Sequence, residues 1–161
     1  MNQLVEDLHN AKCFPFSEWP NPSVPIGAGV YTIWEGARFI YVGMSGRARS
    51  AEQIAQAKLA GKKKMLRERL GSHASGRRSG DQFCVYVSDR LVIGSLSSDD
   101  IAKITTGEVA VDSYVKAYIH KNLSYRFIET PDGPTAAALE DMIRSGETAL
   151  GSPLLNPKRS T

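Results

Sequence analysis

The chain has 161 residues, of which 42% are hydrophobic and 23% are charged. This composition is ordinary for a globular protein, and the length is enough for one domain with a core of its own. No apolar run approaches the roughly 20 residues that cross a bilayer, and the acidic N-terminus differs from a secretion signal. We therefore expect a cytoplasmic protein with no membrane segment. Cys13 and Cys84 lie far apart in sequence and are expected to be reduced thiols.

The positive charge is concentrated in one part of the chain. The net charge is +3, but residues 44–80 contain ten basic and two acidic side chains, a sum of +8, so the remainder sums to −5. Such an excess is typical of a surface that binds a polyanion, because each neutralised phosphate releases a counterion. The alternative is a solvated helix face.

The N-terminal residues predict a short helix followed by an extended arm. Residues 2–12 have the apolar spacing of an amphipathic helix. Residues 14–25 contain four prolines and Trp19, which favours an extended segment that lies against the domain. We assign residues 1–25 to this helix and arm, and residues 26–161 to the main domain.

Residues 29–43 predict a β-hairpin. Two runs of β-forming residues are separated by a short polar break that contains Gly36. Alternation along a strand places Tyr31 and Ile33 on one face. The same rule places Phe39, Tyr41 and Gly43 on one face of the partner strand.

Two helices should follow the hairpin, over residues 51–60 and 62–74, with Gly61 as the joint. On a helical wheel the second helix carries Arg69 and His73 one turn apart, pointing in the same direction. The apolar stripe of this region is expected to contain Leu59, Leu66 and Leu70, and Lys62 lies at its border with Arg69 and His73.

The second half of the chain predicts alternating strands and helices. Residues 82–88 read as a buried strand, and residues 123–128 as another. Between them, residues 89–122 form an expected insertion, with a helix start at Ser97 and an amphipathic helix from residue 111. The last helix covers residues 134–144 and carries Glu140 at the edge of its buried face, where a carboxylate needs a partner or a metal.

Five segments of the chain occur in the order of a known nuclease signature. They are Gly29-Val30-Tyr31, Tyr41-Val42-Gly43, Leu66-Arg67-Glu68-Arg69-Leu70, Ala138-Leu139-Glu140 and Pro153-Leu154-Leu155-Asn156-Pro157. Together they resemble the GIY-YIG nuclease superfamily. The long segment between the hairpin and Arg69 is similar to the restriction-endonuclease branch. The resemblance implies an α/β (α+β) fold with a small, mainly antiparallel sheet flanked by helices. It also implies a metal-dependent DNA endonuclease that uses Mg²⁺ or Mn²⁺.

The resemblance implies a role for each matched side chain. Glu140 would hold the metal ion and Arg69 would contact the phosphate, since a guanidinium matches phosphate oxygens. Tyr31 would take the proton from the attacking water, but His73 could be the base or could relay the proton. Tyr41 would orient the phosphate or the water. The residues expected to contact the substrate are Gly43, Ser45, Arg47, Lys62, Arg77, Arg78 and Asn156.

Two alternatives to catalysis stay open. The chain could be a non-catalytic nucleic-acid-binding module with the same fold, or a structural protein without salt-dependent affinity for DNA. The expected partner is duplex DNA, and a homodimer is a further option. The insertion at residues 89–122 could supply either a dimer contact or a base-reading element.

Overall fold

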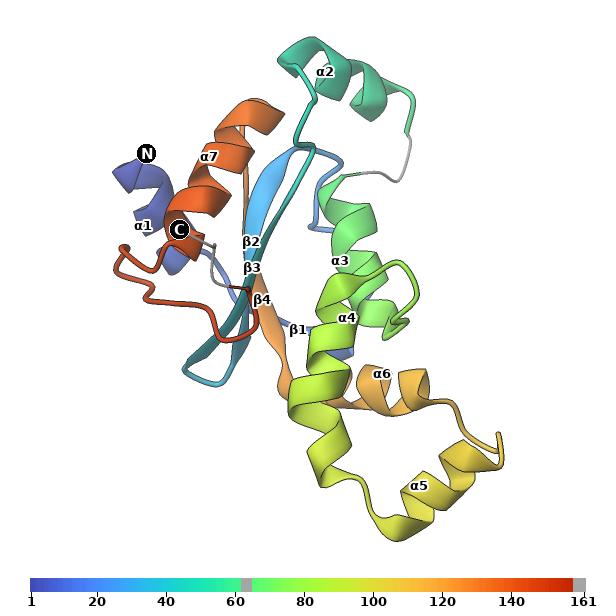
Figure 1. The fold of residues 1–161 in the computed structure, drawn as a ribbon. Helices are drawn as coiled ribbons and strands as arrows, with labels where there is room; N and C mark the ends of the chain where they lie inside the picture. The colour runs from blue at the N-terminus through green and yellow to red at the C-terminus, as the bar shows by residue number, and fades with distance from the viewer. Residues whose placement is uncertain (62–64, 158–161) are drawn as a thin grey trace.

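We describe a computed structural model of the chain for residues 1–61 and 65–157. Within these residues, four strands form one antiparallel sheet in the order β1-β4-β2-β3. The strands are β1 (Phe14–Pro15), β2 (Gly29–Glu35), β3 (Arg38–Ser45) and β4 (Ser124–Glu129). Helices lie on both sides of the sheet (Figure 1). The expected small α/β fold with an antiparallel sheet is confirmed.

The helices divide between the two faces of the sheet. One face is covered by α1 (Asn2–Asn10) and α7 (Gly133–Arg144), and the other by α3 (Leu66–Ser75), α4 (Gln82–Val87) and α6 (Val111–Asn122) (Figure 1). α2 (Ala51–Leu59) and α5 (Ser98–Thr105) lie further from the sheet. The described residues also contain short 3-10 helices at Phe16–Glu18 and Ile93–Ser95 and a π-helical segment at Ser88–Val92. None of the helices in the described ranges is long and apolar enough to cross a membrane.

Alternation along β2 builds the two main cores. Tyr31 and Ile33 point into the first core, which contains Leu66 and Leu70 of α3. Val30 points into the second core with the apolar face of α7. Because both faces of the central strands are buried, the register of the hairpin is fixed by packing on each side.

A bulge in the hairpin makes one prediction wrong: Phe39 does not share a face with Tyr41. Tyr31 is paired with Gly43 and Ile33 with Tyr41, as the alternation predicts, but the register then shifts and Trp34 is paired with Phe39. The extra residue, Ile40, reverses the alternation. Phe39 therefore packs in the second core, whereas Tyr41 packs against the first.

The predicted strand at residues 82–88 is wrong, because this segment is helix α4. Asp81 stands at the N-cap, and its side chain accepts hydrogen bonds from the backbone N–H groups of Phe83 and Cys84. This cap satisfies two donors that a helix start leaves without intrahelical partners. The buried positions Phe83, Cys84 and Val87 then lie on one helical face.

The helices after the hairpin also differ from the prediction. α3 begins at Leu66 rather than near residue 62, and Lys62 lies outside the described residues. Leu59 ends α2 and is 89% exposed, so it does not belong to an apolar stripe with Leu66 and Leu70. The two segments are separate helices, and their helical phases are therefore independent.

Both the N-terminal arm and the middle segment contribute to the first core. Phe16 and Val24 of the arm are fully buried there, as are Val115 and Ile119 of α6. The last part of the segment at residues 89–122 is thus packed into the domain. Cys13 and Cys84 are free thiols, as expected.

Candidate active site

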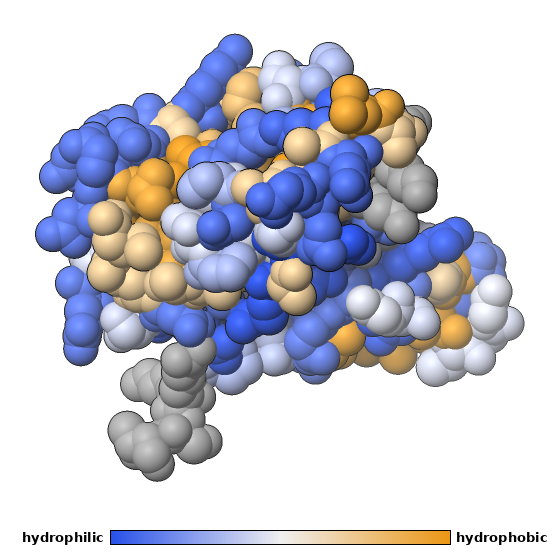
Figure 2. Space-filling view, turned by 90° about the horizontal axis from the view of Figure 1, so that it is seen from above, coloured by the Kyte–Doolittle hydropathy of each residue, from blue (hydrophilic) through white to orange (hydrophobic). Residues whose placement is uncertain are grey.

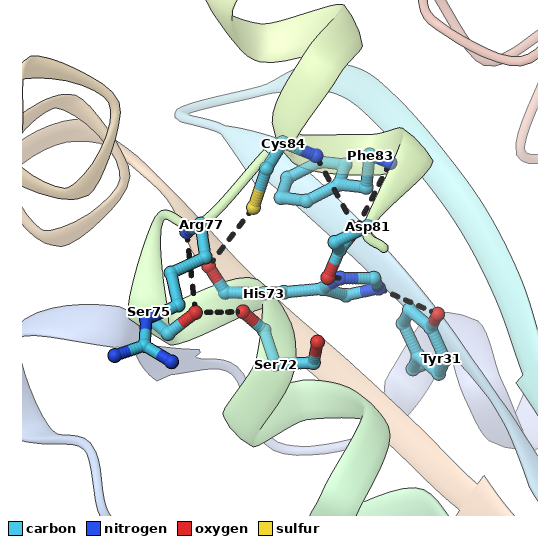
Figure 3. Close-up of polar contacts among 8 residues, drawn as sticks. All are labelled: Tyr31, Ser72, His73, Ser75, Arg77, Asp81, Phe83 and Cys84. Carbon is cyan, nitrogen blue, oxygen red and sulfur yellow. Dashed lines mark hydrogen bonds and ion pairs between the residues drawn. The ribbon is translucent and has the colours of Figure 1, made fainter. Parts of the chain in front are cut away.

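A chain of three buried polar side chains lies between the hairpin and α3. The Tyr31 hydroxyl is 2.7 Å from Nε2 of His73, and Nδ1 of His73 is 2.6 Å from Oδ2 of Asp81 (Figure 3). Each of the three residues is at most 2% exposed. Buried polar groups are costly without partners, so the complete pairing along this chain stabilises a single arrangement.

The direction of the hydrogen bonds follows from the charge of Asp81. Burial raises the pKa of Asp81, but its hydrogen bonds, first of all the one from His73, outweigh burial, so the pKa is lowered. An ionised carboxylate only accepts hydrogen bonds. The proton between these groups is therefore on Nδ1 of His73, which donates to Asp81. In neutral His73, Nε2 then accepts the hydrogen bond from the Tyr31 hydroxyl.

Burial keeps the other two members of the chain neutral. It lowers the pKa of His73 below 6.5, although Asp81 opposes this shift. Burial also raises the pKa of Tyr31 well above 10.0, against the opposing charge and hydrogen bond of Arg69. In the free protein at neutral pH, Tyr31 is a phenol and His73 is an uncharged imidazole.

The Tyr31 end of this hydrogen-bonded series is surrounded by Tyr41, Arg69 and Gly43. The Tyr41 ring centroid is 6.5 Å from that of Tyr31 and 6.0 Å from that of His73. Burial raises the pKa of Tyr41 to about 12. Gly43 lies directly beside Tyr31, because a Cβ atom added there would be 2.3 Å from the Tyr31 hydroxyl oxygen. Glycine at position 43 thus makes room for the hydroxyl.

Glu140 approaches the site from the opposite face of the sheet. It lies on α7, is 6% exposed, and its Oε2 is 3.3 Å from Nη2 of Arg47. The loop that carries Arg47 is held against the start of α7, where the Gly133 N–H donates to the Arg49 carbonyl at 2.9 Å. Glu140 also contributes to the raised pKa of Tyr41, after burial and against Arg69. The carboxylate is therefore near the edge strand β3 and Tyr41.

A polar pocket of about 430 Å³ opens beside these residues. Its lining includes Ser45, Arg47, Arg69 and Ser72. The sheet edge thus brings together two arginines from separate elements next to the buried chain. From above, the surface is mostly hydrophilic, with apolar side chains in small separate groups (Figure 2).

A magnesium ion is compatible with this donor set. Among the residues the structure describes, no group of three or more His, Cys, Asp or Glu side chains could enclose a metal. Mg²⁺ keeps several waters and binds through one or two carboxylates together with substrate phosphates. A single carboxylate such as Glu140 supplies the hard oxygen ligand that this mode requires.

The other predicted substrate contacts are more dispersed. Asn156 uses both ends of its amide on Val42, at 2.9 Å from the backbone N–H and 2.8 Å from the carbonyl. Arg78 is 2.7 Å from Asp112, and Arg77 is exposed on the same loop. Asn156 therefore extends the edge of β3, and the geometry gives it a structural role.

Asp81 belongs to the buried hydrogen-bonded series with Tyr31 and His73. The sequence analysis did not identify it as a site residue. The residue types at 82–88 favour a strand, and a strand has no N-cap residue before it. Asp is a preferred N-cap residue, and the apolar spacing at 83, 84 and 87 fits a helix as well as a strand. Those two signals together would have drawn attention to Asp81.

Comparison of the chain with protein-family models, curated proteins and solved structures gives no match.

Proposed function

We propose that the protein is a metal-dependent DNA endonuclease of GIY-YIG type. The observation that supports this most strongly is the buried hydrogen-bonded chain of Tyr31, His73 and Asp81 next to an exposed arginine and a nearly buried glutamate. Hydrolysis of a phosphodiester needs a proton acceptor for water, charge neutralisation at the phosphate and stabilisation of the leaving oxygen. The site has a side chain for each task.

The chain of hydrogen bonds supports a proton relay that combines the two candidate bases. Water would give its proton to the Tyr31 oxygen while the Tyr31 proton moves to Nε2 of His73. This route avoids a free phenolate, which the raised pKa of Tyr31 opposes. Asp81 would hold the imidazole in place and stabilise the imidazolium that forms.

Arg69 connects phosphate binding to this relay. Its side chain is exposed, and its positive charge lowers the pKa of Tyr31 against the effect of burial, so the guanidinium acts on the Tyr31 hydroxyl. Arg69 also lines the polar pocket, so it can bind a substrate phosphate next to the Tyr31 hydroxyl. Tyr41, with a pKa raised to about 12, stays protonated and is a hydrogen-bond donor to the phosphate or water.

Glu140 would hold the metal ion, and Arg47 would exchange its contact with the carboxylate for a contact with phosphate. The ion would supply charge neutralisation at the scissile phosphate and the leaving oxygen. The carboxylate–guanidinium contact is 3.3 Å long and the Arg47 side chain is 64% exposed, so Arg47 is free to move.

Cleavage of supercoiled plasmid and of linear duplex, with Mg²⁺ or with chelator, tests the proposal. Glu140→Gln keeps the size of the side chain and removes the charge, so it should abolish metal-dependent cleavage while DNA binding persists. Glu147→Gln is the matched control, because Glu147 is exposed beyond the end of α7. If neither metal condition gives cleavage and binding still falls with salt, the chain is a non-catalytic binding module.

A further inference from the structure

A second cavity of about 710 Å³ lies beside the C-terminal segment of the described chain. Its walls come from α4 and the turn after it, from the end of α7, and from residues 152–157. Its lining includes Tyr86, Arg90, Arg144, Pro153 and Leu154. None of these side chains takes part in the proton relay or in the contact of Glu140.

The cavity adjoins the candidate active site along β3. The Leu155 N–H donates to the Ile40 carbonyl at 2.9 Å, and the Asn156 amide pairs with Val42. The cavity wall is therefore hydrogen-bonded to Ile40 and Val42, the residues before and after Tyr41 in β3. Tyr86 and Tyr41 both pack against the first core. A strand whose phosphate is at Tyr41 would therefore continue into this cavity.

The polar groups of the cavity favour an anion. Nη1 of Arg90 donates to the Leu154 carbonyl at 2.7 Å, and Nη2 of Arg144 donates to the Pro157 carbonyl at 3.0 Å. These bonds hold both guanidinium groups at the wall, and each keeps further N–H donors because a guanidinium has five. The described residues that line the cavity include no acidic side chain. Two fixed positive charges without a lining carboxylate match phosphate oxygens.

The remaining wall is aromatic and apolar. Tyr86, Pro153 and Leu154 supply the flat or apolar surface that a base can cover. Stacking of a base on an aromatic side chain is tolerant of sequence, since every base has a π-face. The volume is within the range of about 300–1,000 Å³ that small-molecule sites occupy. Cation, aromatic ring and apolar wall together fit a nucleotide rather than a phosphate ion alone.

We propose that this cavity binds one unpaired nucleotide of the DNA strand next to the cleaved phosphate. The arginines Arg90 and Arg144 contact its phosphate, and Tyr86 stacks on its base. A base inside a duplex stack cannot enter such a cavity, so the preferred substrate is DNA with an unpaired nucleotide beside the cut. The inference rests on the proposed endonuclease site, because it uses that site to place the strand.

Binding measured in chelator tests the cavity separately from cleavage. Two fluorescent probes are compared by anisotropy: a fully paired duplex and the same duplex with one unpaired nucleotide. The wild-type chain should bind the second probe about tenfold more tightly. Tyr86→Leu and the double variant Arg90→Gln/Arg144→Gln should reduce this preference to near zero. Glutamine still donates to a backbone carbonyl, so the C-terminal segment keeps its contacts.

Matched variants separate stacking and charge from folding. Tyr86→Phe keeps the ring and should keep the preference. The double variant Arg90→Gln/Arg144→Gln should lower the salt slope for the unpaired probe by about one, because the phosphate contact is then lost. Arg38→Gln removes an exposed cation at the start of β3 and should affect the two probes equally. Melting temperature monitors the fold of every variant.

A free mononucleotide tests whether the cavity takes the nucleotide itself. Titrated deoxyadenosine monophosphate should compete with the unpaired probe and not with the paired duplex. The proposal is overturned if folded wild-type protein shows no preference for the unpaired probe, or if the preference survives in Tyr86→Leu and in the double arginine variant. A preference without any metal-dependent cleavage would refute the endonuclease and leave the cavity assignment intact. Cleavage without the preference would refute only the cavity.

Discussion

The two halves of the candidate site are built in opposite ways. On one face of the sheet, Tyr31, His73 and Asp81 are at most 2% exposed and are joined by bonds of 2.7 and 2.6 Å. On the other face, one contact of Glu140 is to Arg47, whose side chain is 64% exposed, at 3.3 Å. The first half is complete without a ligand, whereas the second can exchange its partner.

The difference suggests a division of work in the proposed reaction. Proton transfer depends on fixed distances, and a preorganised chain provides them without reorganisation at the moment of reaction. Phosphate and metal carry their own charge and bring their own ligands, so this half of the site needs exposed, movable cations. Changes in the first half should therefore affect both folding and rate, and changes in the second should affect the binding of metal or phosphate with little effect on folding.

Gly43→Ala should have the largest effect on the stability of the fold. The added Cβ would be 2.3 Å from the Tyr31 hydroxyl oxygen, which is too close for any contact, so the tyrosine or the strand must shift. We expect a loss of about 1–3 kcal/mol in the free energy of unfolding from overpacking. We also expect about a hundredfold loss of cleavage rate from misplacement of the relay.

Chemical denaturation and single-turnover cleavage measure these two effects. Gly94→Ala is the control, because a Cβ at Gly94 meets no atom within 4 Å. If Gly43→Ala cleaves DNA at the wild-type rate, the Tyr31 hydroxyl has no part in the reaction.

Asp81→Asn tests the buried half through its pH dependence. Asn is also a good N-cap residue, so α4 should keep its start. The charge that supports the His73 imidazolium is lost, and the rate should fall by about 10²- to 10⁴-fold, the usual contribution of general acid–base catalysis. Asp81 raises the pKa of His73 against burial. Its loss should therefore move the acid limb of the pH–rate profile to lower pH, which a purely structural role would not do.

The stability of the wild-type fold should also depend on the protonation of His73. The pKa of His73 is lower in the folded protein than the 6.5 of a free imidazole, so the unfolded chain takes up the proton first. Stability therefore falls as the pH drops below about 6.5 and continues to fall towards the lower folded pKa. Melting temperatures between about pH 5 and pH 8 check this in the wild type. In His73→Gln the pH dependence over this range should be weaker.

The parts of the site that local patterns specify were predictable from the sequence. The hairpin places Tyr31 and Tyr41 on the side of the first core, as strand alternation indicates, and α3 carries Arg69 and His73 on successive turns. Glu140 lies at the edge of the buried face of α7, where helical spacing placed it. Each of these positions follows from the side-chain periodicity of one strand or one helix, and that periodicity is visible in the sequence.

The parts that were missed depend on competition between interactions. The run Phe83-Cys84-Val85-Tyr86-Val87 favours a strand by its residue types, but the cap at Asp81 and the packing of one face against the first core outweigh that preference. The bulge at Ile40 follows from the register of the whole hairpin and has no signal in the neighbouring residues. The His73–Asp81 contact is likewise a product of tertiary structure.

Arg47→Gln should have the smallest effect on the fold and a distinct effect on metal dependence. The Arg47 side chain is 64% exposed, so solvent screens its contact with the nearly buried Glu140, and the melting temperature should change little. Loss of the cation should lower the salt slope of DNA binding by about one. If Glu140 holds the ion, the change also removes a competitor for the carboxylate, so half-maximal cleavage should need less Mg²⁺. Arg49→Gln, on the same exposed loop, is the control, and an unchanged Mg²⁺ requirement in Arg47→Gln would separate Arg47 from the metal site.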